Sequence, residues 1–152
     1  MQPRTARIVL RVVGVAAVLF AAFGFWYNAE SFSAYRSGAF HDVPANVDVP
    51  YFDAAFLALS SVCVVCFITL AWCGVQFLRL SLSWLWLFIA VASVELLFLL
   101  VVGGLWHHPL YGASIGAASG VSAGGLSPQL LILFPLWAPV AVWFARKSLL
   151  KS

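Results

Sequence analysis

Apolar residues form four long stretches that are separated by short polar segments. A membrane-spanning helix needs roughly 20 mostly apolar residues. The pattern predicts spans at about 8–27, 54–78, 82–106 and 128–147, with outer loops at 28–53 and 107–127. We therefore predict an all-α, polytopic membrane protein. We expect residues 1–152 to form a single membrane domain, a four-transmembrane-helix bundle.

Composition supports a chain solvated by lipid rather than by water. Hydrophobic residues make up 64% of the 152 residues and charged residues 9%, whereas about a quarter of a soluble domain is charged. The eight Lys and Arg residues form no basic stripe of the kind that binds nucleic acid. The lipid bilayer is therefore the expected partner, and nucleic acid is not.

The charges predict how the chain is threaded. With four crossings, seven of the eight basic residues fall on one side, and Arg36 falls on the other with four of the five acidic residues. The positive-inside rule then makes both the N-terminus and the C-terminus cytoplasmic, in a bacterial inner (plasma) membrane. A cleaved signal peptide is the competing interpretation of the first span, but Arg11 interrupts its apolar core and "AFGFWYN" is a poor cleavage site.

Two of the predicted spans have a distinctive helical face. Small residues at helical spacing let membrane helices approach closely. The small face of the first span consists of Gly14, Ala17, Ala21 and Gly24. The weakly polar face of the second span consists of Cys66, Thr69, Cys73 and Gln76. We expect these two faces to turn inward, toward each other or toward another subunit.

A glycine repeat lies in the second outer loop, within "LYGASIGAASGVSAGGLSP". Its glycines recur every four positions, so they share one face of a helix, as in a glycine zipper. The repeat consists of Gly112, Gly116, Gly120 and Gly124. We predict a short packed helix or re-entrant segment; a coil lying on the bundle and a zipper that oligomerises or lines a pore are the alternatives.

Glu95 is the one acidic residue within a predicted span. A carboxyl at mid-bilayer costs roughly 3 kcal/mol and is by default a functional candidate. Its possible roles are a proton relay, a cation site or a polar partner for another subunit. The structural alternative is a buried hydrogen bond to Thr69, Ser93 or a freed backbone carbonyl.

The motif "CVVC", Cys63 to Cys66, resembles the CxxC of the vitamin K epoxide reductase family, small four-helix membrane enzymes that pass electrons between thiols and quinone. The resemblance implies a thiol–quinone oxidoreductase. That family, however, has its CxxC in the last helix and a second cysteine pair in an outer loop. This chain has its motif in the second span and no cysteine in the first outer loop.

The first outer loop is the best candidate for a partner contact. Phe32, Tyr35 and Ala39 share one helical face that would lie along the membrane surface, and Phe40 adds an aromatic side chain. Neither the acidic residues nor His41, His107 and His108 have a spacing typical of a metal or haem site. We therefore expect no metal and no cofactor.

These features predict a binding role rather than an enzyme. The first hypothesis is an accessory or assembly subunit of a larger membrane complex, in contact with other membrane-protein subunits or with itself. The second is a small oligomeric transporter or channel that uses Glu95. The third is the oxidoreductase implied by the CxxC motif.

Overall fold

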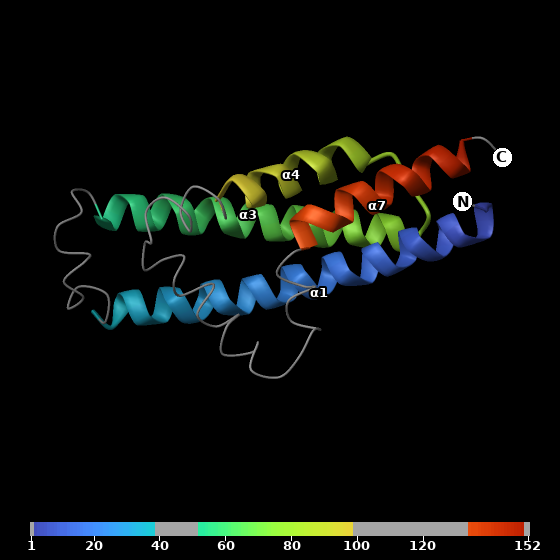
Figure 1. The fold of residues 1–152 in the computed structure, drawn as a ribbon. Coiled ribbons are helices and arrows are strands. Elements are labelled where there is room, and N and C mark those ends of the chain that lie inside the picture. The colour runs from blue at the N-terminus through green and yellow to red at the C-terminus, as the bar shows by residue number, and fades with distance from the viewer. Residues whose placement is uncertain (1, 39–51, 99–133, 151–152) are drawn as a thin grey trace.

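The computed structural model describes residues 2–38, 52–98 and 134–150, and within these ranges the chain is helical and contains no strand. The helices are α1 (Pro3–Arg36), α3 (Phe52–Leu78), α4 (Leu85–Phe98) and α7 (Phe134–Leu149). The predicted all-α class is thus confirmed for the described part of the chain. The helices α1 and α3 form a long antiparallel pair, and α4 and α7 lie on one side of it (Figure 1).

Two of the described helices are long and apolar enough to cross a membrane, over Pro3–Glu30 and Phe56–Leu78. The segment Leu85–Leu97 is apolar but shorter. The predicted spans 82–106 and 128–147 run into residues 99–133, outside the described ranges. The count of four membrane spans therefore stays a prediction.

The first helix continues beyond the predicted span, from Asn28 to Arg36, where the sequence analysis predicts an outer loop that begins with a helical face along the membrane surface. This segment contains no proline or glycine, and it keeps contact with α3 along its length. The helix ends where Gly38 adopts a φ of 81°, a left-handed conformation that glycine reaches without a steric penalty. The first outer loop is accordingly shorter than predicted.

The small face of α1 packs against α3, and its closest approach is between two glycines. A Cβ atom added to Gly14 would lie 2.8 Å from the carbonyl oxygen of Gly74, and one added to Gly74 would lie 2.8 Å from that of Gly14. Ala17 lies against Gly74 in the same interface, and Ala21 is also buried. At Gly24 the ring of Phe67 occupies the space that a Cβ would need. The small side chains thus allow the two backbones to touch.

Aromatic side chains fill the space between the α1–α3 pair and the other two helices. The ring centroids of Phe77 and Phe88 are 4.9 Å apart in an edge-to-face arrangement, and Phe88 meets Phe134 at 6.0 Å. All three side chains are fully buried. Phe20 of α1 stacks on Phe134 at 5.2 Å. Residues from α1, α3, α4 and α7 therefore share one core.

The turn between α3 and α4 is tight and fixes the end of α3. The Ser81 N–H donates to the Gln76 carbonyl and the Leu80 N–H to the Phe77 carbonyl, both at 2.9 Å, while Leu80 has a φ of 61°. This is the Schellman pattern of a helix C-terminus, in which glycine usually occupies the left-handed position. The turn lies at the same end of the bundle as both chain termini (Figure 1).

Candidate functional site

Glu95, the acidic residue predicted to lie within the membrane, is on α4 and faces α3. Its Oε1 atom is buried and has no hydrogen-bond partner among the described residues. The carboxyl lies close enough to Cys63 and Cys66 of α3 to interact electrostatically with both thiols. A buried carboxyl oxygen without a partner is unfavourable, so Glu95 is the candidate centre of the site.

The polar residues that were expected to satisfy Glu95 bond elsewhere. The Thr69 hydroxyl donates to the Val65 carbonyl at 2.7 Å, and the Ser93 hydroxyl donates to the Ile89 carbonyl at 2.8 Å. Both are bonds to the preceding turn of the same helix. Gln76 is ten residues beyond Cys66 on α3, about 15 Å further along the helix axis. The structure therefore does not bring Gln76 to the carboxyl.

The cysteines next to Glu95 are free thiols. Cys63 is half-buried and Cys66 is buried, and no disulfide joins them or Cys73. Cys73 points instead toward the α3–α4 turn, where its thiol is 4.0 Å from the Trp84 carbonyl. Within the described ranges, no group of three or more His, Cys, Asp or Glu side chains could hold a metal ion.

A second cluster of interactions holds the far ends of α1 and α3 together. The Tyr35 ring stacks on Phe56 with a centroid distance of 4.4 Å, and its hydroxyl donates to Asp53 Oδ1 at 2.9 Å. About two turns earlier on α1, Asn28 Nδ2 donates to the Ser60 carbonyl at 3.2 Å. We call Asn28, Tyr35, Asp53, Phe56 and Ser60 the outer clamp. The hydrogen bond from Tyr35 to Asp53 raises the pKa of the Tyr35 hydroxyl above its ordinary value, and desolvation and the Asp53 charge act in the same direction.

Phe32 extends from α1 beside this clamp and is 41% exposed. Its ring centroid is 6.3 Å from that of Tyr35. Of the aromatic residues predicted to contact a partner, Phe32 is thus open to one, whereas Tyr35 is engaged with α3. Phe40 lies outside the described residues, as do Gly112, Gly116, Gly120 and Gly124.

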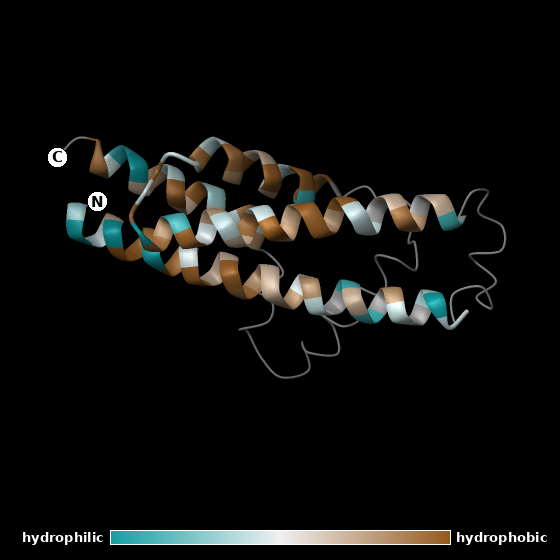
Figure 2. Ribbon diagram, turned by 180° about the vertical axis from the view of Figure 1, so that it is seen from behind, coloured by the Kyte–Doolittle hydropathy of each residue, from teal (hydrophilic) through white to brown (hydrophobic). Residues whose placement is uncertain are grey.

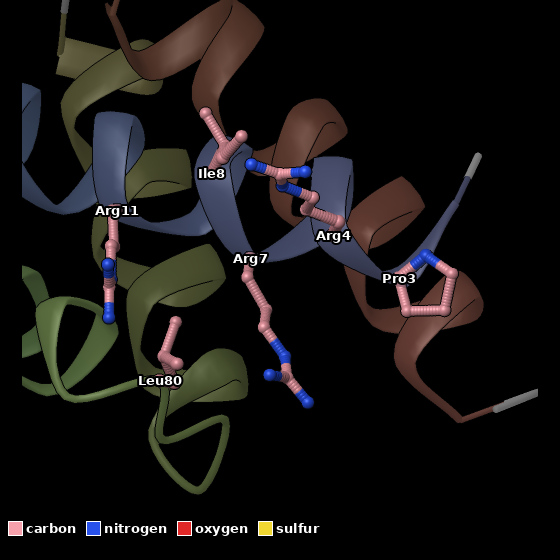
Figure 3. Close-up of a pocket in the computed structure, with 6 residues that line it drawn as sticks. All are labelled: Pro3, Arg4, Arg7, Ile8, Arg11 and Leu80. Carbon is pink, nitrogen blue, oxygen red and sulfur yellow. The ribbon is translucent and has the colours of Figure 1, made fainter.

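The opposite end of the bundle is basic. The first turns of α1 carry Arg4, Arg7 and Arg11, which line a cavity of about 510 Å³ together with Pro3, Ile8 and Leu80 (Figure 3). At the end of α7, the Arg146 guanidinium lies 5.7 Å from the Trp86 ring centroid and 5.5 Å from that of Trp143. Hydrophilic residues concentrate at the ends of the described helices and hydrophobic residues between them (Figure 2).

Comparison with known protein families, with curated proteins and with solved structures finds no match.

Three features of the sites were missed by the sequence analysis. The sequence analysis does not single out Gly74, one of four glycines in the described helices and turns, although the close approach at Gly14 needs an equally small residue on the other helix. The outer clamp joins residues 18 to 32 positions apart, so local periodicity carries no sign of it. The spacing of Arg4, Arg7 and Arg11 puts them on one helical face, so the sequence itself carries a sign of this basic cluster beyond its bearing on topology.

Proposed function

We propose that the protein is an integral membrane protein with four helical spans, lying in a bacterial inner membrane with both termini in the cytoplasm. Two helices of sufficient length support this proposal. Large apolar side chains on the outer surface support it further, since water would solvate them poorly. They include Val12, Leu19, Val65, Ile68, Leu97 and Phe144.

The location of the C-terminus can be measured directly. Fusion of green fluorescent protein to the C-terminus gives a fluorescent product only in the cytoplasm, whereas an alkaline phosphatase fusion is active only outside it. We expect fluorescence and no phosphatase activity in a bacterial host. The reverse result would contradict the orientation, and recovery of the chain in the soluble fraction would contradict the membrane location.

Within that membrane, the function supported best is that of an assembly subunit, which binds another membrane protein through its outer end. The observation that carries this proposal is the length of α1. At 1.5 Å per residue its 34 residues span about 51 Å, whereas the hydrocarbon core is about 30 Å thick. With the first span predicted at 8–27, the turns from Asn28 to Arg36 extend past the apolar layer at the outer end.

The outer clamp keeps these extra turns ordered. A helix that leaves the membrane as an isolated segment frays readily. Here the stacked pair Tyr35–Phe56 and the hydrogen bond from Asn28 attach the end of α1 to α3. The result is a fixed two-helix platform with the exposed ring of Phe32 on it, and aromatic side chains are enriched in protein interfaces.

Photo-crosslinking in the native membrane tests this role. A photoreactive phenylalanine analogue replaces Phe32, and in a matched control it replaces Leu19, which is exposed on the apolar part of the same helix. We expect one protein adduct of fixed mass at position 32 and only lipid adducts at position 19. Protein adducts at neither position, together with a bare chain in native mass spectrometry, would contradict the subunit role.

A second candidate function is supported by Glu95. Its buried Oε1 atom without a described hydrogen-bond partner is suited to bind a proton or a small cation within the membrane. In this alternative the protein is a small oligomeric transporter or channel, and Glu95 is the residue that the transported ion meets.

Flux measurements separate this alternative from the first. Purified protein is reconstituted in liposomes, and the uptake of protons and of monovalent cations is followed with fluorescent indicators. Glu95→Gln should abolish flux, while Glu30→Gln, which removes an exposed carboxyl of α1, should leave it unchanged. Absence of flux in the wild-type chain, or equal flux in Glu95→Gln, would exclude this role for Glu95.

A further inference from the structure

The arginine-lined cavity at the start of α1 is a candidate binding site, in addition to its bearing on the predicted topology. Arg4, Arg7 and Arg11 occupy positions that share one face of the helix. In Figure 3, Arg7 and Arg11 extend from the same side of α1 with Leu80 between them, and the Arg4 guanidinium lies beside Ile8. Three arginines thus line one open cavity of about 510 Å³, within the size range of small-molecule sites.

The positive charge of this cavity is not compensated by the protein. No carboxylate of the described residues forms an ion pair with these arginines, and the first turn of α1 contains no acidic residue. The cap residue Gln2 makes no side-chain hydrogen bond to the helix. Since a helix N-terminus is itself positive, cations there destabilise the helix. A bound anion would remove this repulsion.

The side chains around the cavity indicate which anion fits. Arginine offers a planar fork of N–H donors that matches the oxygens of a phosphate, which the point charge of lysine does not. Ile8, Pro3 and Leu80 add an apolar part to the same lining, and Ile8 is 55% exposed. A fully hydrated ion gains nothing from such a surface, whereas a phosphate attached to hydrocarbon does.

We propose that this cavity binds the phosphate of an anionic phospholipid headgroup, with Arg7 and Arg11 as the principal ligands and Ile8 and Leu80 against the adjoining carbons. The choice of a lipid as the source rests on the membrane location proposed above. Basic pockets at the ends of membrane helices are suited to such headgroups. The site makes the protein selective for anionic over zwitterionic lipid at its basic end.

Native mass spectrometry of the full chain in detergent tests the site, with phosphatidylglycerol or phosphatidylcholine added at equal concentration. We expect one phosphatidylglycerol molecule to bind in preference to phosphatidylcholine, because the three arginines repel the choline cation of the latter. The double variant Arg7→Lys and Arg11→Lys keeps every charge but loses the forks, so it should bind phosphatidylglycerol about tenfold more weakly, the effect of one charge-assisted hydrogen bond. Arg146→Lys, a substitution at the same end outside the cavity, should keep the wild-type affinity.

Two other outcomes would overturn the proposal. An unchanged affinity for phosphatidylglycerol in the Arg7→Lys and Arg11→Lys variant would mean that net charge alone attracts the lipid. Tight binding of inorganic phosphate alone, with displacement of the lipid, would identify a site for a soluble phosphate instead. Because binding is measured in detergent, the result does not depend on the orientation of the chain, which the fusion experiment tests separately.

Discussion

The crossing of α1 and α3 at Gly14 and Gly74 gives the sharpest prediction for stability. A Cβ atom at either position would lie 2.8 Å from a backbone oxygen of the other helix, whereas ordinary contact begins at 3.4 Å. The shortfall is 0.6 Å, and a backbone carbonyl cannot rotate away as a side chain can. Gly14→Ala or Gly74→Ala must therefore push the two helices apart by about this distance.

The size of the effect follows from two opposing contributions. Overpacking an interface costs about 1–3 kcal/mol, and replacing glycine by alanine in a helix returns up to about 1 kcal/mol. Each single variant should therefore lower the free energy of unfolding by about 1–2 kcal/mol. Once the helices have separated for one methyl group, the second finds room, so the double variant should lose less than the sum of the two single losses.

Reversible unfolding by sodium dodecyl sulfate in mixed micelles, followed by far-UV circular dichroism, measures these differences. Ala22→Leu serves as the control, because Ala22 is exposed on the same helix and should tolerate the larger side chain. The close crossing is refuted if both single variants unfold at or above the wild-type detergent fraction. It is also refuted if the effects of the two substitutions simply add.

Three further predictions concern single contacts. Gly24→Ala should destabilise the fold, and Phe67→Ala should relieve much of that loss in a double-mutant cycle by unfolding, because the atoms in the way belong to the Phe67 ring. Phe88→Ala should cost about 3–5 kcal/mol in the same assay, since Phe88 is fully buried and contacts both α3 and α7; a loss below 1 kcal/mol would contradict the shared core. Asp53→Asn should lower the raised pKa of Tyr35, measured by ultraviolet titration with Tyr35→Phe to assign the signal. Because the Tyr35 pKa is raised in the folded state, its contribution to stability is present at neutral pH and is lost as the pH rises through that pKa; an unchanged titration in Asp53→Asn would contradict the hydrogen bond.

The sequence carried enough information to predict helices and the polar residue inside the apolar layer. Helical periodicity predicts one face of Gly14, Ala17, Ala21 and Gly24; in the structure Gly14, Ala17 and Gly24 lie against α3, and Ala21 is buried. Glu95 stood out because ionisable residues in apolar spans are costly. Both signals are local, since each needs only the spacing or polarity within one segment.

The face that α3 turns to its neighbours was harder to predict. The sequence analysis predicts the inward face of this helix from its weak polarity. In the structure, large apolar residues are also buried, among them Leu70 and Phe77. In lipid, the outward side of a helix is as apolar as its inward side, so polarity does not distinguish the two. Thr69 and Gln76 are consequently only half-buried in the structure.

The register between α1 and α3 is the property that links the two proposed binding ends. As the residue number rises along α1, the number of the residue opposite falls along α3 by nearly the same amount. The pairs are Gly14 with Gly74, Gly24 with Phe67, Asn28 with Ser60, and Tyr35 with Phe56. From the first pair to the last, α1 advances 21 positions and α3 recedes 18, a difference of less than one helical turn.

One antiparallel register therefore holds over the whole length of the pair. The basic cavity is built from the start of α1 and the turn after α3, and the outer clamp from the end of α1 and the start of α3. Neither helix can slide along the other without opening the crossing of Gly14 and Gly74, which lies between the basic cavity and the outer clamp. A lipid bound at the basic end and a protein bound at the outer end would thus meet a single rigid element, and each would select the same arrangement of α1 against α3.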